Sequence, residues 1–263
     1  MLRKMTWAVL GLGCLVLGAG LARPAQADPA AEPKLIADLV VANHILFDQA
    51  VVDGFGHISV RSEINPNHYY LARSMAPSLV TAADIIEYDL DSNALDANGR
   101  ASYLERFIHG EIYKLRPDVK AIVHSHSPAV IPFGVTGVPL KPLYHMSSFL
   151  GAGAPVFDIK KAAGETDMLI RNNKLGEDLA KALGDKSVAL MRGHGSVAVG
   201  DSIPQVVFRA VYTEINARLE ADAMKLGPVT FLDPDETREA AKTTAGLIGR
   251  PWEMWKQKVE SQH

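Results

Sequence analysis

The chain has 263 residues, with 27 Lys+Arg, 30 Asp+Glu, nine His and one Cys, and its formal net charge is −3. A mildly acidic chain without a Lys/Arg-rich run argues against nucleic acid binding, because neutralised phosphates supply most of the affinity for nucleic acid. A single cysteine excludes an internal disulfide framework.

The first 27 residues have the three-part pattern of a secretory signal peptide. Arg3 and Lys4 give a positive start, residues 7–21 are uncharged and apolar, and Ala25-Gln-Ala27 supplies the small residues of a cleavage site. The apolar run of about 15 residues is shorter than the roughly 20 needed to span a bilayer, although a membrane-anchoring first helix is the alternative. Cleavage after Ala27 removes the only cysteine, leaves residues 28–263 with a net charge of −6, and predicts a periplasmic or secreted protein.

The remainder is predicted to form a short linker at residues 28–34 and one domain at residues 35–263, since no repeat or low-complexity tract follows. Hydrophobic periodicity, caps and turn residues place its elements. They are, in chain order, a helix at 35–45, strands at 55–61 and 69–72, a helix start at 80–86 capped by Thr81, a strand at 87–91, a turn at 96–99, a helix at 102–115, a strand at 119–126, a helix within 166–183, short strands at 187–191 and 196–199, a long helix at 204–226, and a helical tail from 235. Alternation of strands and helices with short connections predicts one layered α/β domain.

Two histidines end the strand at 119–126. Residues i and i+2 of a strand share a face, so the side chains of His124 and His126 point the same way. Two imidazoles aimed at one point form half of a divalent-metal site. A solvent-facing strand also carries this pattern by chance, so the pair alone leaves both interpretations open.

Two other regions favour the metal site. His194 lies between Gly193 and Gly195, where glycines let the backbone come close to whatever the imidazole binds. Glu105 and His109 are four residues apart on a predicted helix and share one face. Three imidazoles with an open position are typical of a catalytic metal site. The alternative for Glu105 is a solvated carboxylate paired with a neighbouring side chain.

In their order and spacing, these parts resemble the class II aldolase/adducin family over residues 36–226. The matching parts are Gly56-His-Ile-Ser-Val-Arg61, where the aldolases have G-N-(I/V)-S-x-R, Glu105 with His109, Val123-His-Ser-His126, and Arg192-Gly-His-Gly195. The resemblance implies a three-layer α/β/α fold with a central mixed, largely antiparallel sheet. It also implies a homotetramer with sites between neighbouring subunits.

The same resemblance implies the ligands of the metal. His124, His126 and His194 are expected to bind a divalent ion, with Glu105 beside it either as a proton carrier alone or as a proton carrier and fourth ligand. Zinc or manganese is expected, with magnesium, cobalt or iron as alternatives, because imidazole-rich sites accept several metals according to supply.

The departures from the family concern the substrate. Sugar-phosphate aldolases have two serines before this Glu, where the present chain has Tyr103 and Leu104, and the Asn of their G-N-x-S strand is His57 here. An aromatic and an apolar side chain cannot replace two hydroxyl donors to a phosphate dianion. We therefore expect an apolar, flat pocket and a non-phosphorylated substrate.

The strand around His57, together with Leu71-Ala-Arg-Ser-Met-Ala-Pro77 and residues 81–85, resembles the branch that contains hydroxypyridine-dicarboxylate and dihydroxyphthalate decarboxylases. This resemblance implies a metal-dependent carbon–carbon lyase that decarboxylates a hydroxy-aromatic or hydroxy/keto acid through a metal-stabilised enolate. An aldolase or epimerase acting on an unphosphorylated sugar or aldehyde uses the same intermediate and stays open. A non-catalytic binding module like the adducin head and a three-histidine iron site for oxygen chemistry are further alternatives.

Several side chains are candidates for binding the substrate. Tyr103 is expected to line the pocket, and Arg73 or Arg61 to bind the substrate carboxylate. His57 either faces the pocket or replaces the Asn of the family in holding the loop. The alternative for the two arginines is a strand-edge position with an ion pair to Glu63 or Asp84.

Two further features lie toward the C-terminus. Tyr144 and His145 occupy the region where the aldolases place a catalytic tyrosine donated by a neighbouring subunit, and the two residues compete for that role. The tail with Trp252 and Trp255 is expected to pack on the body of the domain or on a neighbouring subunit.

Overall fold

The computed structural model describes residues 31–262, so the predicted signal peptide and the first residues of the linker lie outside the described part. Its centre is a seven-stranded sheet. The strands are β1 (His57–Arg61), β2 (His68–Ala72), β3 (Ile85–Asp89), β4 (Ala121–Ser125), β5 (Val156–Phe157), β6 (Val188–Met191) and β7 (Gly195–Gly200). Their order is β3-β2-β1-β4-β7-β6-β5, and every neighbouring pair is antiparallel except the parallel pair β5–β6.

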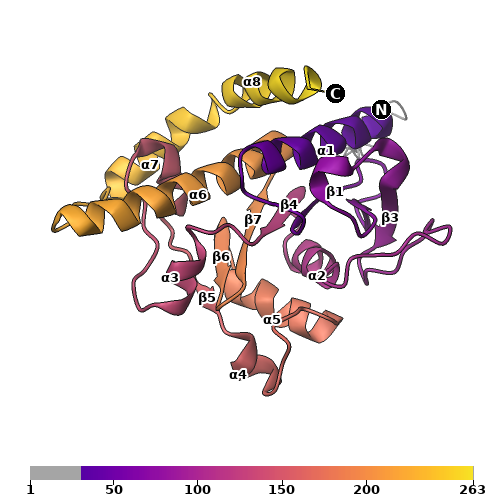
Figure 1. Cartoon of the computed structure of the whole chain (residues 1–263), viewed down its shortest axis with the longest axis horizontal. Coiled ribbons are helices and arrows are strands. Elements are labelled where there is room, and N and C mark those ends of the chain that lie inside the picture. The colour runs from indigo at the N-terminus through magenta and orange to yellow at the C-terminus, as the bar shows by residue number, and fades with distance from the viewer. Residues whose placement is uncertain (1–30, 263) are drawn as a thin grey trace, which may run out of the picture.

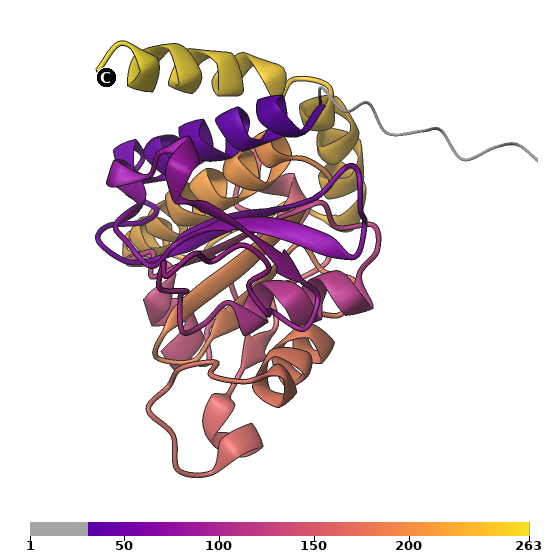
Figure 2. The same ribbon diagram turned by 90° about the vertical axis from the view of Figure 1, so that its right-hand side faces the viewer.

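Helices cover both faces of this sheet (Figure 1). One face carries α1 (Ala31–Asp48), α6 (Ile203–Leu226) and α8 (Gly249–Glu260), and the other carries α2 (Phe107–Leu115) and α5 (Asn173–Leu183). Figure 2 shows the three layers from the side. The predicted three-layer α/β/α fold with a mixed, largely antiparallel sheet is therefore confirmed.

The remaining elements are short connections and the C-terminal region. They are η1 (Pro77–Leu79), η2 (Ala82–Asp84), α3 (Ile131–Val135), η3 (His145–Leu150), α4 (Ile159–Ala163) and α7 (Pro234–Ala245). Between residues 31 and 262 no helix is both long and apolar enough to cross a membrane.

Two hydrophobic cores follow from the alternation of side chains along the strands. In β4, Ala121 and Val123 pack under α1, α6 and α8, whereas Ile122 packs under α2 and α5. His124 is therefore on the α2/α5 face, one step further along the strand. Trp252 and Trp255 of α8 are buried in the first core, which confirms that the tail packs on the body of the domain.

The structure corrects three predicted boundaries. Helix α1 begins at Ala31, inside the predicted linker, and the buried Glu32 carboxylate accepts hydrogen bonds from the amides of Glu63 and Ile64, both at 3.0 Å. The helix predicted after Thr81 is one short turn, because Ile85 and the next residue enter the sheet. The helix predicted from residue 102 begins only at Phe107.

Candidate metal centre

Strand pairing brings three histidines together. β7 lies antiparallel to β4, with Val197 opposite His124, so the hairpin between β6 and β7 returns beside the end of β4. His194 in this hairpin lies against His126, which follows the last residue of β4, and their Nε2 atoms are 3.0 Å apart. The imidazole of His124 has its ring centre 5.0 Å from each of the other two.

The hairpin can approach β4 this closely only because residue 195 is a glycine. A Cβ at Gly195 would collide with the carbonyl oxygen of Ser125 and lie 3.1 Å from the Cα of His126. Gly193 has a φ of +63°, a backbone conformation that favours glycine. The glycines around His194 thus serve the contact between two backbones.

We expect Gly195→Ala to destabilise the fold by about 2 kcal/mol and to weaken metal binding, because the hairpin must move away from β4. Urea unfolding and metal titration measure the two effects. Gly249→Ala is the matched control, since a Cβ there meets no atom within 4 Å. Equal stability of the two variants would contradict the close approach as the reason for the glycine.

Glu105 completes the cluster from a different position than predicted. It lies in the turn before α2, and its Oε2 is 3.5 Å from Nε2 of His124 and 3.3 Å from Nε2 of His194. Its Oε1 accepts a hydrogen bond from the amide of Ile170 at 2.9 Å. His109 lies within α2 and instead contacts β1, so the predicted shared helix face of Glu105 and His109 does not exist.

The four side chains fit a divalent metal. Glu105, His124, His126 and His194 offer ligand atoms that all lie within 4.8 Å of one another. Nδ1 of His124 faces the carbonyl of Ser196 at 3.1 Å, and Nδ1 of His194 faces that of Met168 at 2.9 Å. A carbonyl can only accept, so each Nδ1 carries the proton and each Nε2 keeps its lone pair for a ligand bond. Nε2 of His124 is buried without a hydrogen bond, which a metal ligand would explain.

The electrostatics of the cluster differ between its members: burial lowers the pKa of His194, but the interactions with Glu105 outweigh burial and raise that pKa above its usual value. Burial and the neighbouring histidines lower the pKa of His126 to about 4. Burial would raise the pKa of Glu105, but its interactions with His124 and His194 outweigh burial and hold that pKa well below the usual range. At neutral pH the cluster therefore contains an ionised carboxylate and a neutral imidazole, the forms that bind metal ions.

A cavity of about 300 Å³ lies beside the cluster. Tyr103 and Leu104 line it, together with Met75 and His57, as expected for an apolar pocket. The Tyr103 hydroxyl donates to the carbonyl of Met75 at 2.5 Å, and its ring centre is 4.5 Å from that of His57. The Tyr103 side chain therefore offers the cavity mainly its ring.

Both candidate arginines are occupied elsewhere. Nε of Arg73 donates to Asp84 at 2.6 Å, and Arg73 is not among the residues that line the cavity, so the structure supports the ion-pair alternative. Arg61 donates to the carbonyl oxygens of Tyr113 and Arg116 at the end of α2, at 2.7 and 3.2 Å. A guanidinium at a helix C-terminus complements the helix dipole.

Tyr144 and His145 lie apart from the cavity within one chain. Tyr144 precedes η3, and His145 lines a separate cavity of about 630 Å³ with Phe208 and Tyr212 of α6. Their contribution to the site of a neighbouring subunit stays a prediction.

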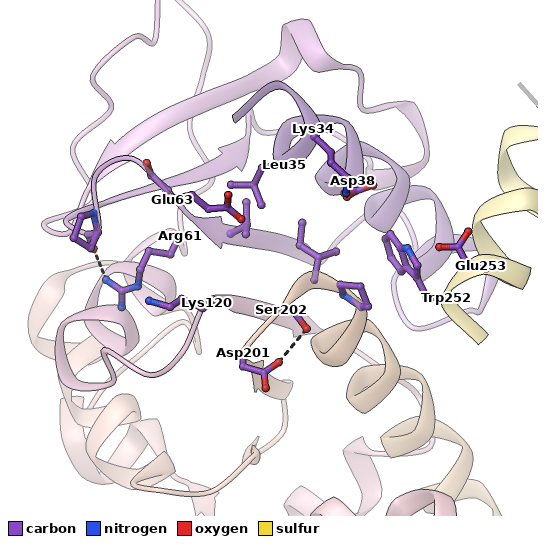
Figure 3. Close-up of a pocket in the computed structure, with 15 residues that line it drawn as sticks. Lys34, Leu35, Asp38, Arg61, Glu63, Lys120, Asp201, Ser202, Trp252 and Glu253 are labelled. Atoms are coloured by element: carbon purple, nitrogen blue, oxygen red, sulfur yellow. Dashed lines mark hydrogen bonds and ion pairs between the residues drawn. The ribbon is translucent and has the colours of Figure 1, made fainter. Parts of the chain in front are cut away.

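A larger cavity lies away from the metal cluster. It has about 700 Å³ and lies beyond the opposite end of β1, with Arg61, Lys120 and Trp252 in its walls (Figure 3). None of the four residues of the metal cluster lines it.

Three buried polar residues of α6 that were not among the predicted site residues hold loops, and one of these loops directly follows His126. Glu214 accepts from the Ser127 hydroxyl at 2.6 Å, directly after His126. Asn216 accepts from the amide of Leu143 at 2.9 Å, and Glu220 from the amide of Lys141 at 3.1 Å. The sequence contains one indication of this role: these polar residues lie on the same side of α6 as its apolar residues.

Glu220 makes stability depend on pH. Burial raises its pKa from 4.5 to about 7, with the Lys141 amide opposing only partly. Because the folded-state pKa lies above the unfolded value, its stabilisation is complete below about pH 4.5 and is lost as the pH rises through 7. In the wild-type protein we expect the free energy of unfolding to fall by about 2 kcal/mol between pH 5 and 8 because of Glu220. Urea unfolding should show that this fall is absent in Glu220→Gln. Asp222→Asn, at an exposed carboxylate of α6, should keep the wild-type pH dependence.

Comparisons with known proteins agree with this geometry. Residues 37–221 match the family model of the class II aldolase and adducin N-terminal domain. Decarboxylase tropJ from Talaromyces stipitatus is 40% identical over 242 residues, covering 83% of this chain and 91% of its own. The 3,4-dihydroxyphthalate decarboxylase from Arthrobacter keyseri is 29% identical over 204 residues, covering 72% and 78%.

Among solved structures, L-fuculose 1-phosphate aldolase from Glaciozyma antarctica PI12 has a TM-score of 0.74 at 25% identity, covering 92% of this chain and 94% of that one. The fold, the cluster and the family match lead to one conclusion. The chain belongs to the class II aldolase/adducin family.

Proposed function

We propose that the chain is a metal-dependent decarboxylase of a non-phosphorylated hydroxy-aromatic or hydroxy/keto acid. The observation that carries this proposal is the cavity beside the three histidines, where Tyr103 and Leu104 offer an aromatic and an apolar wall. A planar ring packs against such walls, whereas a phosphate requires donors. Two relatives with decarboxylase in their names support the reaction class.

The residues of the chain have separate parts in this reaction. His124, His126 and His194 would hold the metal, with Glu105 beside them. When bound, a divalent metal supplies Lewis acid chemistry at an oxygen next to the reacting carbon. The bond to the carboxylate breaks, its electron pair stays on the substrate carbon, CO2 leaves, and a proton drawn from solvent through Glu105 is added to that carbon.

CO2 release tests the proposal. The protein reconstituted separately with Zn²⁺ and Mn²⁺ is incubated with 3,4-dihydroxyphthalate, hydroxybenzoates and aliphatic keto acids, and a chelator is added to a parallel sample. Release of CO2 that the chelator abolishes is expected for at least one hydroxy-aromatic acid. Absence of CO2 from every acid, in protein that holds one metal ion per chain, would overturn the proposal.

An aldolase is the second candidate, because the L-fuculose 1-phosphate aldolase shares the fold. Mass spectrometry of the products separates the two reactions. Decarboxylation gives CO2 and one product, whereas aldol cleavage gives two carbonyl fragments. The aldolase becomes the better description only if an unphosphorylated sugar or aldehyde is cleaved without loss of CO2.

The proposal also covers the identity of the metal, the oligomeric state and the localisation of the protein. We infer zinc or manganese as the metal, a homotetramer, and export with cleavage after Ala27. Elemental analysis, light scattering and N-terminal sequencing of the secreted product test these three points. A mature protein that still begins with residue 1 would contradict the export proposal.

A further inference from the structure

A buried row of polar side chains, which we call the seam, joins the cavity to the interior between β1 and α2. Nδ1 of His57 is 2.7 Å from Nε2 of His109, and Nδ1 of His109 is 2.6 Å from the Ser59 hydroxyl. The Ser59 hydroxyl is 2.8 Å from the Tyr113 hydroxyl, which is 3.4 Å from the carbonyl of Lys120. His57 and Ser59 are two residues apart in β1 and share a strand face, and His109 and Tyr113 are four residues apart in α2 and share a helix face, which places the four side chains in one row.

The seam is closed to water except at its cavity end. Ser59, His109 and Tyr113 are at most 1% exposed, and His57 is 4% exposed and lines the cavity. Burial lowers the pKa of His57 and that of His109, the latter to about 3, so both imidazoles are neutral and each hydrogen bond of the seam uses one proton. The direction of these protons therefore decides which nitrogen of His57 carries its hydrogen.

Two directions are possible, and they differ in the number of bonds. If His57 donates to His109, His109 to Ser59 and Ser59 to Tyr113, then the Tyr113 hydroxyl still donates to the Lys120 carbonyl, and all four bonds form. In the reverse direction the Tyr113 hydroxyl donates to Ser59. It then cannot donate to the Lys120 carbonyl, so only three hydrogen bonds form. The first direction makes one more hydrogen bond and is therefore favoured, although this bond is long at 3.4 Å and the Lys120 carbonyl also accepts from the Arg61 amide at 2.7 Å.

We propose that the seam holds His57 with its hydrogen on Nδ1 and its lone pair on Nε2, directed into the cavity as a hydrogen-bond acceptor. Within residues 31–262, the His57 side chain makes its hydrogen bond through Nδ1, and His57 lines the cavity. On the basis of the proposed function, the acceptor selects a substrate that has a hydroxyl beside its carboxylate. His57 contacts the substrate in this proposal, and Ser59, His109 and Tyr113 are positioning residues.

Nitrogen-15 NMR of the histidine-labelled, Zn²⁺-loaded protein tests the proposal directly. Protonated and unprotonated imidazole nitrogens have different ¹⁵N chemical shifts, and His57→Gln assigns the signals of His57. We expect a protonated Nδ1 and an unprotonated Nε2 in the wild-type protein. A proton on Nε2 would overturn the proposal without any need for a seam variant.

Tyr113→Phe tests the role of the seam. Without the Tyr113 hydroxyl, Ser59 is expected to donate to His109, which reverses the seam and moves the His57 proton to Nε2. Tyr69→Phe is the matched control, since the buried Tyr69 ring centre lies 5.4 Å from that of Tyr113 but its hydroxyl donates to Ser92 at 2.9 Å. If Tyr113→Phe keeps the wild-type His57 signals, the seam does not set the tautomer. Ser59→Ala gives the same comparison if Tyr113→Phe does not fold.

Ligand binding provides the second measurement. We expect the wild-type protein to bind 2-hydroxybenzoate more tightly than 2-methoxybenzoate, and Tyr113→Phe to reduce this preference roughly 5- to 10-fold, the effect of one neutral hydrogen bond. An unchanged preference would contradict the acceptor role of His57. Failure of the decarboxylase proposal is a separate result, because the NMR signals and these two probes do not depend on CO2 release.

Discussion

His124→Ala is expected to remove the bound metal and, with it, at least a hundredfold of the turnover. His124 is fully buried between β1 and β7, and its Nε2 has no hydrogen-bond partner to compete with a metal. Altering even the residues that orient metal ligands costs 10- to 100-fold in affinity or activity, so loss of a ligand should cost more. Elemental analysis after dialysis and the rate of CO2 release measure the two losses.

His68→Ala is the matched control for this experiment. His68 is also a strand histidine, in β2, but its Nδ1 lies 2.6 Å from the carboxylate of Glu87 in β3, and it is not part of the cluster. This variant should keep one metal ion per chain. If His124→Ala retains its metal as fully as His68→Ala does, the four-residue cluster is not the metal site.

Glu105→Gln should separate chemistry from metal binding. The amide keeps the shape of the side chain and its contact with Ile170, but it cannot carry a proton to the substrate carbon. General acid–base catalysis contributes about 10²- to 10⁴-fold, so we expect kcat to fall by that factor. The three histidines remain, and metal should stay bound, at most about tenfold more weakly.

Glu111→Gln is the control, because Glu111 is a buried glutamate of α2 that pairs with Lys114 at 2.7 Å, outside the cavity. It should leave kcat close to the wild-type value. Complete loss of metal in Glu105→Gln would instead identify Glu105 as an essential ligand. Unchanged kcat with bound metal would contradict its role as the proton carrier.

The sequence predicted the fold well where periodicity is strong. The strand predicted from alternating polarity at residues 55–61, the β-branched strand at 119–126 and the long helix at 204–226 lie close to the observed bounds of β1, β4 and α6. The short elements α3 and β5 were not predicted, because five and two residues are too few to give a periodic signal. Helix α1 extends to Ala31 because the carboxylate of Glu32 bonds to a loop that is distant in sequence, a tertiary contact that local propensity does not report.

The site was predicted from residue types, and its geometry could not be. The three histidines and Glu105 come together as expected, but Glu105 does so from a turn, because helix α2 starts two residues later. The sequence does not predict the seam. Ser59 and Tyr113 belong to different elements, 54 residues apart, and only the packing of α2 on the sheet brings their hydroxyl groups into contact. The ion pair of Arg73 with Asp84 was one of the two predicted alternatives, because the two residues lie only 11 positions apart in the sequence.

Tyr103 and Leu104 place part of the cavity wall on a segment that is separate from the metal ligands. The metal ligands His124 and His126 belong to a sheet strand and its end, whereas the cavity wall at residues 103–104 comes from the segment before α2. The Leu104 side chain is half exposed, so its replacement disturbs no core packing. A substitution at Leu104 can therefore change the wall of the cavity without moving the metal ligands, whereas a substitution at Tyr103, which packs against both hydrophobic cores, also changes the core.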